Sequence, residues 1–186
     1  VEMPGYSGNI KFMDLPAVRE QTKSIRDNAK VRGAAAVRGF SVYRAEGKVD
    51  DTLERTSEYV HTVASLLKED NLLFIMEPET GLWGNDAASM MKIADSVDLE
   101  NICFLTDPAN LHLQGLNAVD ESLKLLCDTR FVGMHAKFYG LPVTSGIRAS
   151  QEHSATFHGP LSHDASNFRI FIKTYAECLS MINHSI

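Results

Sequence analysis

Leu72-Leu73-Phe74-Ile75-Met76-Glu77 is the stretch that decides the fold of this chain, because it is an apolar run that ends on a carboxylate. Residues 102–106 repeat the pattern and lead to Asp107, and residues 131–134 lead to His135. Runs that are apolar on both faces are typical of parallel strands buried between two layers. The three polar residues follow one another at intervals of 30 and 28 residues, which suits one strand, one helix and two loops.

Side chains at the same end of successive parallel strands are expected to converge on one point. Two carboxylates and an imidazole are ligands that divalent metal ions accept in proteins. Glu77, Asp107 and His135 are therefore the candidate metal ligands of this sequence.

Composition predicts one ordinary globular domain over residues 1–186, with 44% hydrophobic and 23% charged residues. The formal net charge of −6 argues against nucleic acid as the main partner. Cys103, Cys127 and Cys178 are odd in number and widely spaced, so we predict reduced cysteines buried in the core. Neither a signal peptide nor a long apolar span is visible, and the expected location is therefore the cytoplasm, away from membranes.

Helical and strand patterns alternate along the chain and predict a parallel sheet covered by helices. A loop of about 25 residues, rich in Gly, Ser and His, is expected after the strand that carries His135. No glycine-rich phosphate loop follows a strand, and ligands at consecutive strand ends favour a (β/α)8 barrel over an open sheet. The expected helices are 14–32, 51–68, 85–97, 116–127 and 165–179, and the expected strands are 35–43, 72–76, 102–107 and 131–136, with the end of one at 9–13 and the start of another at 182–186.

Several motifs give the chain a family resemblance. Asp107-Pro108-Ala109-Asn110-Leu111 and Met134-His135-Ala136-Lys137 resemble two strand ends of the xylose-isomerase-like TIM-barrel superfamily, the sugar (phosphate) isomerases and epimerases. Residues 33–41 and 159–172 are similar to its fourth strand and to the segment that enters its last helix. The resemblance implies an incomplete (β/α)8 TIM barrel: strands four to seven plus the start of strand eight, without the first strands and the last metal-ligand Glu.

The resemblance also implies a reaction. A divalent ion (Mn, Mg, Co or Zn) would bind a sugar or sugar phosphate, and a proton would move next to the carbonyl through an enediolate. Glu77 would be both a metal ligand and an acid/base group, beside the ligands Asp107 and His135. The residues that would contact substrate are Asn110, Lys137, Arg148 and Arg38. Such an enzyme belongs to carbohydrate metabolism.

Other interpretations of these residues stay open. Asp107 could cap a helix or turn before Pro108, His135 could be a satisfied core histidine, and Arg38 could simply pair with a neighbouring carboxylate. Phe138 replaces the Asp that usually follows the family's Lys. Alternative functions are a barrel-type apurinic endonuclease, or a non-catalytic fragment that binds a sugar or a partner. An unclosed sheet edge would favour association, including a homo-oligomer.

Overall fold

Helices and strands alternate along most of the chain, as the sequence predicts. The computed structural model describes residues 15–42, 51–138 and 153–158. The elements in chain order are α1 (Leu15–Val31), β1 (Ala36–Gly39), α2 (Asp51–Lys68), β2 (Leu73–Met76), α3 (Ala87–Val97), β3 (Ile102–Thr106), α4 (Pro108–Leu113), α5 (Ala118–Leu126), β4 (Phe131–Phe138) and β5 (His153–His158).

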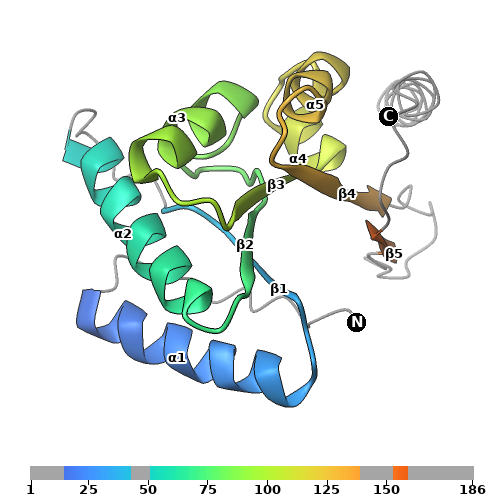
Figure 1. The fold of residues 1–186 in the computed structure, drawn as a ribbon. Helices are drawn as coiled ribbons and strands as arrows, with labels where there is room; N and C mark the ends of the chain where they lie inside the picture. The colour runs from blue at the N-terminus through green and yellow to red at the C-terminus, as the bar shows by residue number, and fades with distance from the viewer. Residues whose placement is uncertain (1–14, 43–50, 139–152, 159–186) are drawn as a thin grey trace, which may run out of the picture.

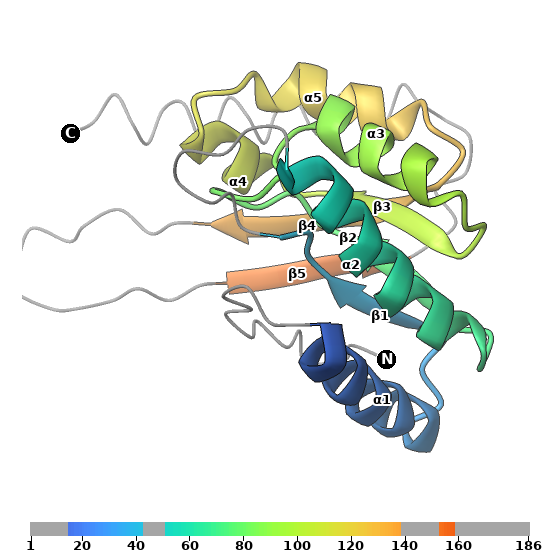
Figure 2. The ribbon, with the colours of Figure 1, turned by 90° about the vertical axis from the view of Figure 1, so that its left-hand side faces the viewer.

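The first four strands form a parallel sheet in the order of the chain, β1-β2-β3-β4. The longer helices lie along an arc outside these strands (Figure 1), and α2 contacts both α1 and α3. Seen from the side, α2, α3 and α5 run along the strands on one face of the sheet (Figure 2). This arrangement confirms the prediction of part of a (β/α) barrel. The assignment of β1 to β4 as strands four to seven stays a prediction.

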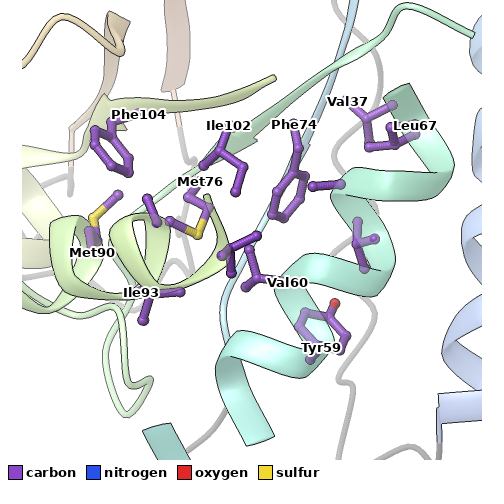
Figure 3. Close-up of a cluster of buried hydrophobic side chains, with 14 of the residues drawn as sticks. Val37, Tyr59, Val60, Leu67, Phe74, Met76, Met90, Ile93, Ile102 and Phe104 are labelled. Carbon is purple, nitrogen blue, oxygen red and sulfur yellow. The ribbon is translucent and has the colours of Figure 1, made fainter. Parts of the chain in front are cut away.

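The main hydrophobic core lies between the outer face of the sheet and the helices. Alternate residues of β2 and β3 point outward and meet apolar residues of α2 and α3 (Figure 3). Gly39 allows this packing, because a Cβ there would lie 2.7 Å from the Phe74 ring. The largest buried contributors include Phe74, Met76, Ile102, Phe104, Leu67, Met90 and Ile93.

The inner face of the sheet carries a smaller apolar cluster formed by Ile75, Cys103 and Leu105. Side chains of a strand alternate between faces with a period of two residues. The residue two positions after Ile75 is Glu77, and the residue two positions after Leu105 is Asp107. The same alternation that buries the inner cluster therefore directs both carboxylates to the inner side of the sheet.

The structure corrects the expected loop after β4. Residues 153–158 form β5, which pairs antiparallel with β4, from Gly133 opposite His158 to Phe138 opposite His153. The prediction was wrong because it used the Gly, Ser and His content of the whole segment. The edge of β4 offers unpaired backbone groups, and a short strand such as β5 can satisfy them.

Two smaller predictions were also wrong. Residues 108–113 form the short helix α4, which was not expected, and Cys127 is exposed at the end of α5 instead of buried in the core. Cys103 is buried, as predicted, and Cys103 and Cys127 are free cysteines. The expected strands at 9–13 and 182–186, the helix at 165–179, Cys178 and the motif at 159–172 lie outside the described residues. Within the described ranges, no helix has the length and apolarity needed to cross a membrane.

Candidate metal centre

Glu77, Asp107 and His135 lie together at the carboxyl ends of β2, β3 and β4. Their exposed fractions are 1%, 0% and 5%. His135 Nδ1 is 2.7 Å from Glu77 Oε1 and 3.3 Å from Asp107 Oδ2. The predicted convergence of the three side chains is therefore present, and one imidazole nitrogen faces both carboxylates.

The spacing of these atoms suits a divalent ion. One ligand atom from each residue lies within 4.8 Å of the other two. Ligands that stand about 2.1 Å from an ion at right angles to each other are about 3 Å apart. The distances of 2.7 Å and 3.3 Å bracket that value. The donor set is chemically suitable as well, since carboxylate oxygens and a neutral imidazole bind Mn, Mg, Co or Zn ions.

Asp107 caps α4, one of the two roles that the sequence left open. Its Oδ1 accepts the backbone N–H of Asn110 at 2.9 Å and so caps the first turn of α4, while Oδ2 faces His135. The cap fixes the orientation of the carboxylate, because one oxygen is committed to the helix N-terminus. Helix capping and metal binding are therefore compatible uses of this one side chain.

Arg38 approaches the same cluster from β1. Its Nη1 donates a hydrogen bond to Glu77 Oε2 and lies 3.1 Å from His135 Nδ1. The register of the parallel pair sets Arg38 beside Ile75, two residues before Glu77. Arg38 therefore does pair with a neighbouring carboxylate, and that carboxylate is the predicted metal ligand.

Asn110 is a buried connector between α4 and the loop after β2. Its Nδ2 donates to Pro78 O at 3.0 Å and to Glu79 Oε2 at 3.2 Å. The backbone carbonyl oxygen of Asn110 accepts a hydrogen bond from Gln114 Nε2 at 3.0 Å. No sequence pattern links Asn110 with Glu79, although the four-residue spacing to Gln114 would indicate a contact once α4 is recognised.

Comparison with solved structures places this arrangement among known folds. The probable 3-DHS dehydratase AsbF from Bacillus anthracis superposes with a TM-score of 0.58 at 13% identity, over 70% of this chain and 47% of that one. A D-tagatose 3-epimerase-like protein gives 0.56 at 16% identity, over 66% and 49%. D-psicose 3-epimerase from Clostridium cellulolyticum H10 gives 0.54 at 12% identity, over 69% and 47%.

The fold is that of part of a (β/α) TIM barrel, as in these solved structures. The chain spans about half the length of the solved structures it resembles. No family model matches the sequence, and no curated protein matches it either.

For two of the residues predicted to contact substrate, the structure does not describe side-chain contacts. Lys137 lies on β4 two residues after His135, opposite Ser154 of β5, and Arg148 lies outside the described residues. Their contacts with substrate stay predictions.

The electrostatics of the cluster favour a charged imidazole when the protein is metal-free. Burial favours the neutral ring, but hydrogen bonds to Asp107 and Glu77 outweigh burial and raise the pKa of His135 to about 9. A proton on Nδ1 then compensates part of the negative charge of the two buried carboxylates. A metal ion bound at this nitrogen would have to displace that proton.

The raised pKa of His135 predicts how the stability of the metal-free protein depends on pH. The ordinary value is 6.5 and the folded value about 9, so the stabilisation is complete below pH 6.5 and is lost as the pH rises through 9. We expect the free energy of unfolding to fall by on the order of 2–3 kcal/mol from this group. Urea denaturation in EDTA between pH 6 and pH 9.5 measures the change.

His135→Gln should flatten this pH dependence, whatever its effect on stability at pH 6. His61→Gln, at an exposed position on α2, should leave the dependence unchanged. An equal slope in wild type and His135→Gln would show that other groups cause it.

Proposed function

We propose that this chain carries the metal site of a divalent-metal-dependent sugar or sugar-phosphate isomerase or epimerase. The observation that carries the proposal is the buried group of Glu77, Asp107 and His135 at three consecutive strand ends of this barrel fold. Two of the similar solved structures are those of a 3-epimerase-like protein and a 3-epimerase. Epimerisation at carbon 3 of a 2-ketose changes the carbon next to the carbonyl.

The residues of the cluster suit proton transfer at that carbon. A divalent ion, when bound, supplies charge that polarises the carbonyl and acidifies the neighbouring C–H bond. Glu77 would accept the proton, because a carboxylate within reach of a C–H next to a polarised carbonyl is a suitable base. Asp107 and His135 would hold the ion and keep their orientation through α4 and the sheet.

The residues proposed to contact the substrate have less direct support than the three proposed metal ligands. Asn110 already donates to Pro78 and Glu79, so its main role in the proposed enzyme would be to hold the loop after β2. Arg38 is 26% exposed in its side chain and reaches the cluster from β1, which suits a group that faces the substrate. Lys137 and Arg148 remain candidates for hydroxyl or phosphate contacts.

Solvent exchange tests the proposal without assuming which sugar is the natural one. The purified chain, loaded with Mn²⁺, Mg²⁺, Co²⁺ or Zn²⁺, is incubated in D₂O with a panel of ketoses and ketose phosphates. Proton NMR should show metal-dependent loss of the signal from the carbon next to the carbonyl. His135→Ala should lower the exchange by at least about 100-fold, because a lost ligand removes the ion and the charge it supplies.

The alternatives give different results in the same samples. Stoichiometric metal binding without exchange on any sugar would support a non-catalytic binding protein. Metal-dependent cutting of DNA at abasic sites would support the apurinic endonuclease, although the net charge of −6 disfavours it. Absence of metal binding by the folded chain would refute the proposed enzyme.

A further inference from the structure

Arg38 brings a permanent positive charge to the cluster. The two oxygens of Glu77 are divided between His135 and Arg38: Oε1 lies 2.7 Å from His135 Nδ1, and Oε2 accepts from Arg38 Nη1. A divalent ion that binds Glu77 therefore meets a carboxylate that already accepts a hydrogen bond from a guanidinium.

The position of Arg38 is built into the sheet. Its backbone lies in register with Ile75 of β2, and the Glu77 N–H donates to Gly39 O at 3.1 Å. Because Arg38 and Glu77 lie on neighbouring parallel strands with this fixed offset, the guanidinium reaches the carboxylate without distortion of the backbone. The contact is a consequence of the register and not a surface pairing of two long, mobile side chains.

The Arg38 guanidinium is also partly exposed to solvent, so it has room to move away from Glu77. The Arg38 side chain is 26% exposed, whereas the Glu77 side chain is 0% exposed. The ring of Phe40, on the same segment, lies 5.8 Å from the Arg38 guanidinium carbon, so the cation keeps an aromatic contact only as long as it stays near that ring. Rotation of the Arg38 side chain could therefore uncover Glu77 Oε2 while the carboxylate stays in place.

We propose that Arg38 is an internal competitor of the divalent ion. Its guanidinium holds Glu77 Oε2 in the metal-free protein and lies 3.1 Å from His135 Nδ1. Its charge therefore opposes an ion bound by Glu77 and His135 and weakens metal binding, while it protects the empty cluster from charge repulsion. The inference rests on the proposed function, because it assumes that Glu77 is a metal ligand. It assigns Arg38 a positioning role in addition to any contact with substrate.

Calorimetric titration with Mn²⁺ tests the proposal. Arg38→Met removes the charge but keeps an apolar stem of similar reach, and it should bind Mn²⁺ at least 10-fold more tightly than wild type. Arg38→Lys keeps a cation and should bind within about threefold of wild type. Arg19→Met makes the same change of net charge at an exposed position of α1 and should leave the affinity unchanged.

Thermal unfolding gives a second measurement. In EDTA, Arg38→Met should melt at a lower temperature than wild type, because Glu77 loses one partner in the buried cluster. With Mn²⁺ the rise in melting temperature should be larger for Arg38→Met than for wild type. If Arg38→Met does not fold, Arg38→Gln, which keeps hydrogen-bond donors without a charge, should show the same tightening.

The outcomes separate this inference from the proposed function. Wild-type binding that is not tightened in Arg38→Met or Arg38→Gln would overturn the competitor role and leave the metal site intact. Absence of Mn²⁺ binding in wild type and in both variants would overturn the metal site and the inference together. Tight binding in Arg38→Met that Glu77→Gln abolishes in the same background would establish that Arg38 and the ion compete for Glu77.

Discussion

Replacing Glu77 with Gln should weaken Mn²⁺ binding by at least about 100-fold, beyond the roughly 10–100-fold lost when a residue that only hydrogen-bonds a metal ligand is changed. The neutral amide removes one of two buried carboxylates that would bind the ion, without changing the size of the side chain. Proton exchange on a ketose should fall by about 10²–10⁴-fold, the usual contribution of a positioned base. Calorimetry and NMR exchange measure the two effects separately.

Glu79→Gln is the matched control for this change. Glu79 is two residues away, and its Oε2 accepts from Asn110, a bond that the carbonyl oxygen of Gln can also accept. We expect the affinity for Mn²⁺ to change less than threefold. Equal losses in Glu77→Gln and Glu79→Gln would indicate a general effect of acidic charge, and the specific ligand role of Glu77 would have to be abandoned.

Phe104→Ala should cost about 3–5 kcal/mol of the free energy of unfolding, the usual effect of removing a large aromatic side chain from a core. Phe104 is fully buried on β3 and packs in the main core (Figure 3). The Arg130 guanidinium also lies 4.8 Å from its ring centre, and that contact is lost too. Urea denaturation followed by circular dichroism measures the loss.

The control for this prediction is Leu113→Ala at the end of α4, where the side chain is 60% exposed. It should change stability by no more than about 0.5 kcal/mol. A loss below about 1.5 kcal/mol in Phe104→Ala would mean that the core between the sheet and the helices is less tightly packed than the complete burial of Phe104 indicates.

Most of the order of helices and strands could be predicted from the pattern of apolar residues. That pattern is clear in helices buried on one face and in strands buried on both faces. The helix predicted at 51–68 agrees with α2, and the apolar runs before Glu77 and Asp107 agree with β2 and β3. The short helix α4 was missed because six residues carry too little periodicity to stand out. β5 was missed because antiparallel pairing depends on a free strand edge, which only the assembled sheet presents.

Part of the candidate site could also be predicted from the sequence, and part could not. Glu77, Asp107 and His135 could be identified together because parallel strands end at the same edge of a sheet. The bond from Asn110 to Glu79 and the cap of α4 by Asp107 could not, since each depends on the path of a loop. Sequence reasoning could propose both a cap and a ligand role for Asp107, but it could not tell that Oδ1 caps the helix while Oδ2 faces His135.

By itself, the sequence determined the alternation of strands and helices and the three polar residues at successive strand ends. Period-two alternation along a strand and the common direction of parallel strands suffice for that. Only the tertiary structure decided that Arg38 meets Glu77 Oε2, that Nδ1 of His135 faces both carboxylates, and that the pKa of His135 is raised to about 9. These features depend on distances between side chains of different strands, which strand register and helix packing set across the whole sheet.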